Sequence, residues 1–408
     1  MKKSFGLLGE KLQHSFSPLI HGYLGDYEYP LYEIPPCDLD AFMTEKRFDG
    51  INVTIPYKQA VMSYCATVSD EARSIGSVNT IIKDANGSLH GHNTDYHGFS
   101  MMLERGKIDP NGNKVLVLGD GGSARTVRAA LNGLGAREIV TISRRGENHY
   151  GNIAQHYDAQ IIVNTTPVGM YPNNGCSPLS LAGFEQLMGV ADLIYNPART
   201  GLLLEAEQLG VPCVNGLAML VAQAEMASRL FVDGTARPEL VDEIINIIHK
   251  KTQNIALIGM PGCGKTTVGR TLAEAMGRPF TDIDELIETT AGKSIPTIFA
   301  EDGEETFRRL ETGILADESK KNGQVIATGG GIVTRQENLD LLRQNSLIVY
   351  LKCDINELAT EGRPITQSVG IEALATQRTP LYEAWSDCII EVEAELERTV
   401  ARILEVIT

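Results

Sequence analysis

A glycine-rich segment in the second half of this 408-residue chain constrains its fold more than any other feature. Residues 259–266 read Gly-Met-Pro-Gly-Cys-Gly-Lys-Thr and fit the pattern G-x-x-x-x-G-K-[ST]. The apolar run 255–258 before it predicts a buried strand, and Val268, Leu272 and Met276 after it recur on one helical face. A strand, a glycine loop and a helix in this order are the context in which such a loop cradles a polyphosphate. The sequence therefore predicts a nucleoside triphosphate site at this loop.

The residue types in the loop suit that ligand. Its glycines let backbone N–H groups turn toward the phosphates, Lys265 reaches the β- and γ-phosphates, and the Thr266 hydroxyl holds Mg²⁺. A glycine-rich turn with a solvated lysine is the alternative, and eight correctly spaced positions speak against it. The residues that we expect to bind ATP here are Gly259, Gly262, Gly264, Lys265, Thr266 and Thr267.

Length and composition limit what the whole chain can be. A chain of 408 residues predicts two or three domains, and 43% hydrophobic residues suffice for ordinary cores. The net charge of −16 argues against a nucleic-acid partner. The seven cysteines are scattered and form no C-x-x-C pair, which indicates a reducing compartment and no zinc site. Without a long apolar run or a signal-like start, we expect a soluble cytoplasmic protein with no membrane partner.

A second glycine loop lies in the first half of the chain. Residues 114–118 predict a strand, 119–124 match G-x-G-x-x-A, 127–134 continue as a helix, and 138–142 predict the next strand. Alone the motif is weak, but its position inside a βαβ unit favours a dinucleotide-binding (Rossmann) domain. The expected cofactor residues in this loop are Gly119, Gly121, Gly122, Ser123 and Ala124.

The residues after the second strand of this unit indicate which dinucleotide binds. An NAD enzyme places an acidic residue there, whereas this chain has Ser143, Arg144 and Arg145. Two guanidinium groups suit a 2′-phosphate, so we expect NADP(H); a solvated basic loop is the alternative. Asp120 counts against this cofactor prediction, since it puts a carboxylate in the loop that faces the pyrophosphate, unless its side chain points away or caps the helix.

Residues 4–100 alternate short apolar runs with helical patterns and predict a further α/β region. Its polar clusters 14–18, 52–58, 76–80 and 93–95 would line a pocket for a small polyhydroxylated ligand. Helix capping is the alternative for each cluster taken singly, and Ser17 before a proline is an example.

Residues 1 to about 250 resemble shikimate dehydrogenase. The match includes the polar clusters above, the dinucleotide loop and the motifs at 164–170, 192–197 and 216–224. The resemblance implies reduction of 3-dehydroshikimate to shikimate by NADPH. It makes Lys58 and Asp95 the catalytic pair and places Tyr195 near the reacting centre. The implied substrate contacts are Ser15, Ser17, Thr54, Asn79, Asp95 and Gln223.

The chemistry of the implied pair is independently reasonable. Hydride attack on a ketone builds negative charge on oxygen, so a nearby group must supply a proton. Lys58 can do so, and the Asp95 carboxylate keeps it charged and oriented. A surface ion pair is the alternative, and the expected place of both residues in loops after apolar strands favours the pocket.

Residues from about 253 onward resemble shikimate kinase, through the phosphate loop and the motifs at 282–284, 307–308, 329–331, 363–364 and 378–382. The resemblance puts Asp282 with Thr266 near Mg²⁺ and makes Asp284 a catalytic residue on the hydroxyls of shikimate. It implies that a lid near 355–377 brings Arg363 to ATP and to the transferring phosphoryl group. Ile365 and Thr366, which follow Arg363-Pro364, depart from the usual leucine pair. The remaining substrate contacts implied are Arg308, Gly329, Gly330, Gly331 and Arg378.

These observations predict an α/β chain in three parts. Residues 1–100 with 216–250 would form the substrate domain, 101–215 the Rossmann domain, 251–253 a short link, and 254–408 a P-loop kinase domain with a parallel sheet, like nucleoside monophosphate kinases. We expect a bifunctional enzyme that makes shikimate and then phosphorylates it, using NADPH, ATP and Mg²⁺, and possible homo-oligomers. The alternatives are a quinate/shikimate-type dehydrogenase joined to another small-molecule kinase, or one half kept as a metabolite-sensing module.

Overall fold

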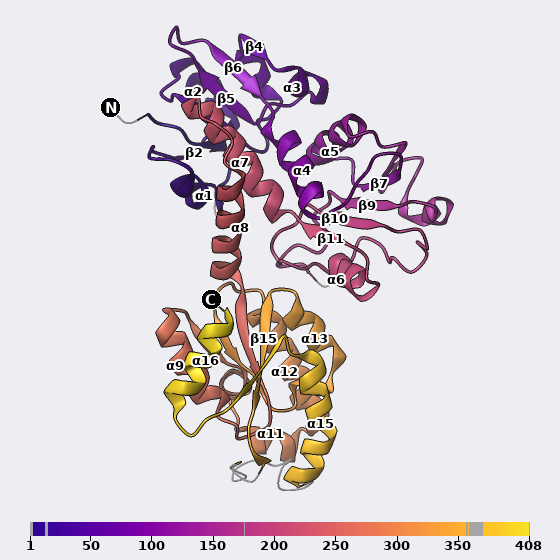
Figure 1. The fold of residues 1–408 in the computed structure, drawn as a ribbon, viewed down its shortest axis with the longest axis vertical. Coiled ribbons are helices and arrows are strands. Elements are labelled where there is room, and N and C mark those ends of the chain that lie inside the picture. Colours follow the sequence, from indigo (N-terminus) through magenta and orange to yellow (C-terminus); the bar gives the residue numbers. More distant parts are fainter. Residues whose placement is uncertain (1–2, 13–14, 175, 356–357, 359–369, 408) are drawn as a thin grey trace. The chain divides into compact units, whose positions relative to one another are not determined.

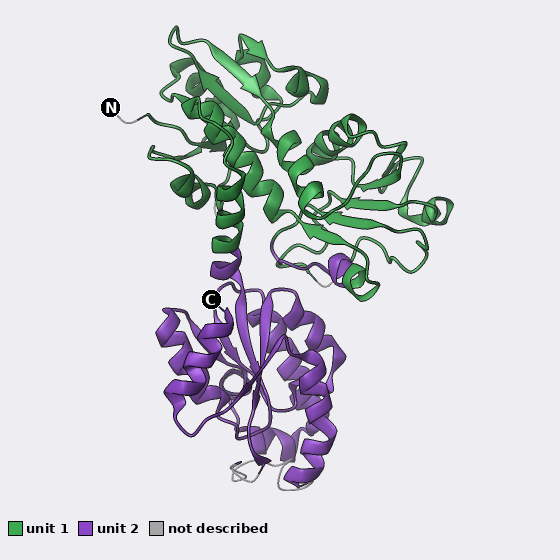
Figure 2. Cartoon of the chain, in the orientation of Figure 1, with its two compact units in different colours: residues 1–195, 205–248 green, residues 196–204, 249–408 purple. Residues whose placement is uncertain are grey.

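The computed structural model describes residues 3–12, 15–174, 176–355, 358 and 370–407. The chain divides into two compact units, 1–195 with 205–248 and 196–204 with 249–408 (Figure 2). In the described part of the chain, three β-sheets flanked by helices form the fold, which confirms the predicted α/β class (Figure 1). Among the described residues, no helix has the length and apolar character needed to cross a membrane.

The first sheet has six strands in the order β2-β1-β3-β5-β6-β4. β1 pairs parallel with β2 and β3, whereas β5 pairs antiparallel with β3 and β6. Its strands are β1 (Leu7–Gly9), β2 (Leu31–Glu33), β3 (Gly50–Val53), β4 (Thr67–Val68), β5 (Thr80–Lys83) and β6 (Leu89–His92). Its helices are α1 (Ser17–Leu24), α2 (Leu39–Glu45) and α3 (Asp70–Ile75), with 3₁₀ turns η1 (Pro36–Asp38) and η2 (Ala60–Tyr64).

The second sheet is parallel throughout, in the order β11-β10-β9-β7-β8. The predicted strands 114–118 and 138–142 are confirmed as β7 (Lys114–Leu118) and β8 (Glu138–Ile142). The other elements of this part are β9 (Ile161–Asn164), β10 (Gly189–Asp192), β11 (Cys213–Asn215), α4 (Thr94–Arg105), α5 (Gly122–Gly133), α6 (Gly201–Gln208) and η3 (Tyr150–His156). In a parallel sheet of this kind ligands bind beyond the carboxyl ends of the strands, where the loop after β7 lies.

Two long helices at the end of the first unit pack against its N-terminal part, as the apolar pattern before residue 250 predicts. α7 (Leu217–Val232) packs along α4 and α1. α8 (Pro238–Thr252) buries Val241, Ile244 and Ile248 against apolar side chains of α1 and α7. Residues 251 and 252, predicted as part of a link, form the end of α8, because the helical pattern continues through the polar residues there.

The third sheet is also parallel, in the order β13-β14-β12-β15-β16. Its strands are β12 (Asn254–Ile258), β13 (Phe280–Asp282), β14 (Val325–Ala327), β15 (Ser346–Lys352) and β16 (Cys388–Glu391). Its helices are α9 (Lys265–Met276), α10 (Ile283–Ala291), α11 (Ile295–Glu301), α12 (Glu304–Glu318), α13 (Gln336–Arg343), α15 (Ile371–Trp385) and α16 (Leu396–Ile407), with η4 (Ile332–Thr334). The predicted strand, loop and helix around the phosphate motif are therefore confirmed as β12 and α9, and α9 ends at Gly277 with φ of 61°.

Candidate active sites

A cavity of about 490 Å³ lies in the first unit, lined from β1 and β3 and from α4, α5 and α7. It gathers residues that are more than 200 positions apart in the sequence. Every residue that the dehydrogenase resemblance assigns to substrate or catalysis lines this cavity: Ser15, Ser17, Thr54, Lys58, Asn79, Asp95, Tyr195 and Gln223.

Lys58 and Asp95 form an ion pair at the wall of this cavity. Lys58 Nζ donates to Asp95 Oδ2 at 2.6 Å, with 29% and 15% of the two side chains exposed. Lys58 follows β3 in a turn, whereas Asp95 lies in the first turn of α4 and not in a loop as predicted. The helix fixes the carboxylate more firmly than a loop would, and the shared cavity distinguishes this pair from a solvated surface pair.

A hydrogen-bond network holds the amides beside this pair. The Asn79 side chain accepts from Thr94 N at 2.7 Å and donates to Thr94 Oγ1 at 3.1 Å. Thr94 Oγ1 in turn donates to Gln223 Oε1 at 3.4 Å. α4 and α7 approach closely at Gly98, where a Cβ atom would lie 2.7 Å from a backbone carbonyl of α7. The network therefore joins the two helices that carry Asp95 and Gln223.

The capping alternative for Ser17 is wrong. α1 begins at Ser17 with Phe16 at the cap position, and no side chain caps this end. Ser15 Oγ instead accepts from the Ser17 N–H at 3.2 Å. Because Ser17 is already inside the helix, its hydroxyl is not used for capping and lines the cavity.

Asn52 is a cavity residue to which the sequence interpretation gave no role of its own. It lies within β3, is 5% exposed, and accepts from the Tyr29 hydroxyl at 2.7 Å. Its amide nitrogen donates to Thr80 Oγ1 at 3.0 Å. A polar residue in an otherwise apolar strand was the available signal, since a buried amide needs partners.

The dinucleotide loop joins β7 to α5. Gly119 has φ of 102°, and a side chain there would crowd Thr165 and Thr166. Gly121 occupies the cap position of α5 without a side-chain cap, so the first N–H groups of the helix point into the loop, as pyrophosphate binding requires. Gly122 and Ser123 line the same cavity as Lys58, whereas Ala124 is buried in the core.

The basic residues predicted to select NADP follow β8. Ser143 is buried, and Arg144 and Arg145 are exposed beside the loop, where Gly119 N donates to the carbonyl of Ile142 at 2.8 Å. Asp120 is exposed too. Burial raises the pKa of Tyr150, and the charges of Arg144 and Asp120 act on that pKa in opposite directions, so both charges lie near this ring. The positions of the two arginines fit a phosphate at the edge of the loop.

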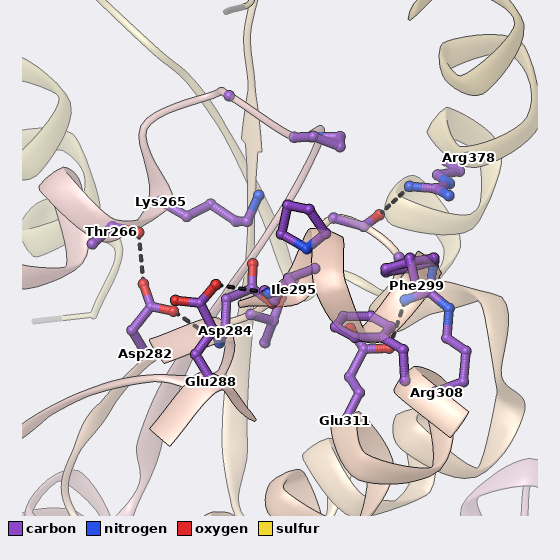
Figure 3. A pocket seen from close by; sticks show the side chains of 18 of the residues that line it. Lys265, Thr266, Asp282, Asp284, Glu288, Ile295, Phe299, Arg308, Glu311 and Arg378 are labelled. Atoms are coloured by element: carbon purple, nitrogen blue, oxygen red, sulfur yellow. Dashed lines mark hydrogen bonds and ion pairs between the residues drawn. The ribbon is translucent and has the colours of Figure 1, made fainter. Parts of the chain in front are cut away.

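A second cavity, of about 510 Å³, lies in the second unit beyond the carboxyl ends of β12, β13 and β14 (Figure 3). It brings together the predicted residues Gly262, Gly264, Lys265, Thr266, Thr267, Asp282, Asp284, Arg308, Gly329, Gly330, Gly331 and Arg378. Gly259, with φ of 148°, opens the loop at the end of β12. Arg363 and much of the predicted lid, 355–377, lie outside the described residues.

The phosphate loop encloses Lys265, the first residue of α9. Lys265 Nζ donates to the carbonyls of Gly259 and Met260, each at 2.9 Å. A hydrogen bond with Cys353 and the charge of Lys265 lower the pKa of the Cys263 thiol to about 6 despite its burial. The Lys265 ammonium group and the N-terminus of α9 are the features of the loop that suit an anion.

Thr266 and Asp282 provide oxygen ligands of the kind that Mg²⁺ uses. Thr266 Oγ1 donates to Asp282 Oδ2 at 2.6 Å (Figure 3). Asp282 Oδ1 caps α10 by accepting from Asp284 N at 2.9 Å. No group of three metal-binding side chains occurs among the described residues. The pair fits a Mg²⁺ ion that keeps water and takes phosphate oxygens as its other ligands.

Two buried carboxyl groups face the glycine triplet. A Cβ atom on Gly329 would lie 2.6 Å from Glu311 Oε1 and 2.8 Å from Asp284 Oδ1. Burial, followed by the negative charges of Glu311 and Asp282, raises the pKa of Asp284 to about 7. A carboxyl group tuned close to neutral pH can take up a proton from a reacting hydroxyl.

Glu311 also orients an arginine, a role that the sequence interpretation missed. Its Oε2 accepts from Arg308 Nη1 at 2.7 Å, with the Glu311 side chain fully buried and that of Arg308 6% exposed. Glu311 follows Arg308 by three positions on α12, so helical spacing was the available signal. A Cβ atom on Gly331 would overlap the guanidinium group, which explains why a glycine lies there.

Several polar atoms at this cavity have no hydrogen-bond partner within the described part of the chain: Asp284 Oδ1, Glu311 Oε1, Arg308 Nε and Arg378 Nε. Buried polar groups in native proteins are normally paired, so a bound ligand is expected to satisfy them. Two carboxyl groups and two arginines suit a small ligand with hydroxyls and a carboxylate.

The first unit thus has the fold and cavity of a dinucleotide-dependent oxidoreductase, and the second those of a P-loop phosphotransferase. Residues 7–81 match the family model for the shikimate dehydrogenase substrate binding domain, and residues 261–408 match that for shikimate kinase. The chain belongs to the shikimate dehydrogenase family and carries a shikimate kinase domain, which makes it a bifunctional fusion enzyme.

Curated and solved relatives agree with this assignment. Shikimate dehydrogenase (NADP(+)) of Clostridium perfringens is 38% identical over 269 residues, which cover 59% of this chain and 98% of the relative. A chorismate mutase/shikimate 5-dehydrogenase fusion protein from Clostridium acetobutylicum is 38% identical, with a TM-score of 0.57 over 61% of this chain and 97% of that one. Shikimate 5-dehydrogenase from Thermus thermophilus, solved with NADP(H) and shikimate, is 31% identical, with a TM-score of 0.55 over 60% and 99%.

Proposed function

We propose that the first unit reduces 3-dehydroshikimate to shikimate with NADPH and that the second phosphorylates the 3-hydroxyl of shikimate with ATP and Mg²⁺. The observation that carries the proposal is the paired Lys58 and Asp95 in a cavity that Gly122 and Ser123 of the dinucleotide loop also line. Relatives named for NADP(+), and one solved with NADP(H) and shikimate, support the choice of ligands.

In the dehydrogenase, Lys58 is the proton donor. NADPH, when bound, supplies the hydride. Lys58 Nζ lies at the cavity wall with Asp95 Oδ2 2.6 Å away, so the carboxylate orients the ammonium group that donates its proton to the substrate oxygen. The remaining hydroxyls and amides hold the ring of the substrate, and the Asn79, Thr94 and Gln223 network fixes two of these amides in place.

In the kinase, Asp284 accepts the proton of the attacking hydroxyl. Bound ATP with Mg²⁺ supplies the phosphoryl group. Lys265 and the first turn of α9 attract the phosphates, and Thr266 and Asp282 hold the metal ion. Arg308 and Arg378 bind the substrate carboxylate in bidentate fashion, and Arg363 assists the transfer of the phosphoryl group.

One reaction mixture tests both assignments. Full-length protein is given 3-dehydroshikimate, NADPH and MgATP while NADPH oxidation and ADP release are followed together. ADP release should require NADPH and should return when shikimate replaces 3-dehydroshikimate and NADPH. NADPH consumption with no ADP from added shikimate would assign the kinase to another substrate, and faster turnover of quinate than of shikimate would favour the alternative dehydrogenase.

A further inference from the structure

Two side chains of α15 reach the same carbonyl of the glycine triplet. Arg378 Nη1 donates to the oxygen of Gly330 at 3.0 Å (Figure 3). The Tyr382 hydroxyl donates to the same oxygen. Arg378 and Tyr382 are four positions apart and so lie on one face of the helix. Of the two, only Arg378 lines the cavity.

Tyr382 is held rigidly behind the cavity. Its side chain is fully buried, and its ring stacks on Tyr350 of β15 with centroids 5.1 Å apart and an interplanar angle of 25°. Burial raises the pKa of Tyr382 well above its ordinary range, so the hydroxyl keeps its proton at any working pH. Because a carbonyl oxygen only accepts, the tyrosine must be the donor.

This arrangement fixes the direction of one peptide plane. A carbonyl oxygen has two lone pairs, and here Arg378 and Tyr382 take both. In a trans peptide the C=O and the following N–H point in opposite directions, so the N–H of Gly331 points away from α15. That N–H has no backbone partner within the described residues, and Gly331 lines the cavity beside Arg308.

We propose that Tyr382 is a positioning residue of the kinase site, whose hydroxyl holds the Gly330 carbonyl so that the Gly331 N–H stays directed at the substrate. The proposal rests on the proposed function of this site. Arg378 lines the cavity and can turn to the carboxylate of the substrate, whereas Tyr382 lies behind the cavity wall. The tyrosine therefore keeps the peptide in place when the arginine turns to the substrate.

The test compares Tyr382→Phe with Tyr350→Phe in the full-length protein. Each variant loses one hydroxyl from the same stacked pair, but the Tyr350 hydroxyl bonds Thr379 and not the triplet. Loss of the hydrogen bond from Tyr382 to the Gly330 carbonyl should raise the KM for shikimate in the kinase reaction about tenfold in Tyr382→Phe, which corresponds to the free energy of one hydrogen bond. The KM for ATP and the dehydrogenase turnover should stay within twofold, and Tyr350→Phe should resemble the unchanged chain.

Two results would overturn the proposal: an unchanged KM for shikimate in Tyr382→Phe, or equal increases in both KM values in both variants, which would indicate general loosening of the core. Failure of the proposed function looks different. In that case the unchanged chain itself would release no ADP with shikimate.

Discussion

Lys58 Nζ lies 2.6 Å from Asp95 Oδ2, although the two residues are 37 positions apart and belong to different elements. Lys58 lies in the turn that follows β3, and Asp95 lies in the first turn of α4 after Asn93, whose side chain caps that helix by accepting from Tyr96 N. Because the cap fixes the first turn of α4, the Asp95 carboxylate is already oriented before any ligand binds. The geometry therefore fixes the direction of the lysine side chain.

Replacing this lysine should separate the two activities. Lys58→Met keeps most of the length of the side chain and removes the proton donor, so dehydrogenase kcat should fall by roughly 10²- to 10⁴-fold. Kinase kcat, measured on the same preparation with shikimate and MgATP, should be unchanged and serves as the control for folding. Asp95→Asn should also slow the dehydrogenase, since the lysine loses its counter-charge. Full dehydrogenase turnover in Lys58→Met would contradict the role assigned here.

The raised pKa of Asp284 predicts a pH limit for the kinase. A carboxyl group with a pKa of about 7 is mostly protonated at pH 6 and cannot accept a proton. Kinase kcat/KM for shikimate should therefore fall by about tenfold for each pH unit below neutral, and rise to a plateau above it. A profile that stays flat from pH 5.5 to 8 would rule out Asp284 as the base.

Glu311 offers a sharper form of this test. Its negative charge is the largest influence after burial that raises the pKa of Asp284. Glu311→Gln removes that charge, so the acidic limb of the kinase profile should move toward lower pH, whatever happens to the absolute rate. A limb that moves to higher pH would contradict the electrostatic explanation.

Local patterns were sufficient to predict much of the fold. The strands at 114–118 and 138–142 and the helix that ends before Gly277 were confirmed, because apolar periodicity and a glycine stop signal are properties of a few adjacent residues. The phosphate loop needs only a strand, glycines and a helix in order. The eight dehydrogenase residues assigned by motif and resemblance likewise line one cavity.

Contacts that depend on tertiary packing were not predictable in the same way. The Tyr382 hydroxyl donates a hydrogen bond to the carbonyl of Gly330, which lies 52 positions earlier in the sequence. The sequence around either residue contains no pattern that predicts this contact. Asp95 was expected in a loop because the sequence shows its polar neighbours but not the start of α4. The Ser17 hydroxyl was offered as a cap because proline often follows one, whereas the chain begins α1 a residue earlier.

The two arginines after β8 predict the coenzyme preference. Loss of both guanidinium groups in Arg144→Ala with Arg145→Ala should raise the KM for NADPH roughly 10- to 100-fold, with little change in the KM for NADH. Arg137→Ala is the matched control, since Arg137 is an exposed arginine just before the opposite end of β8. Equal loss of NADPH and NADH binding in the double variant would point to a damaged loop, and no loss at all would favour the solvated basic loop.

Gly331 gives the last prediction, because its φ of −101° is allowed for alanine and only space forbids a side chain. An added Cβ atom would overlap the Arg308 guanidinium, which Glu311 holds in place. Gly331→Ala should therefore displace Arg308 and raise the KM for shikimate roughly 10- to 100-fold in the kinase reaction. Gly313→Ala is the control, since Gly313 lies on α12 with nothing within 4 Å of the added atom, and a helical alanine there should stabilise by about 0.5–1 kcal/mol. If Gly331→Ala bound shikimate as well as Gly313→Ala does, Arg308 could not be the group that fixes the substrate carboxylate.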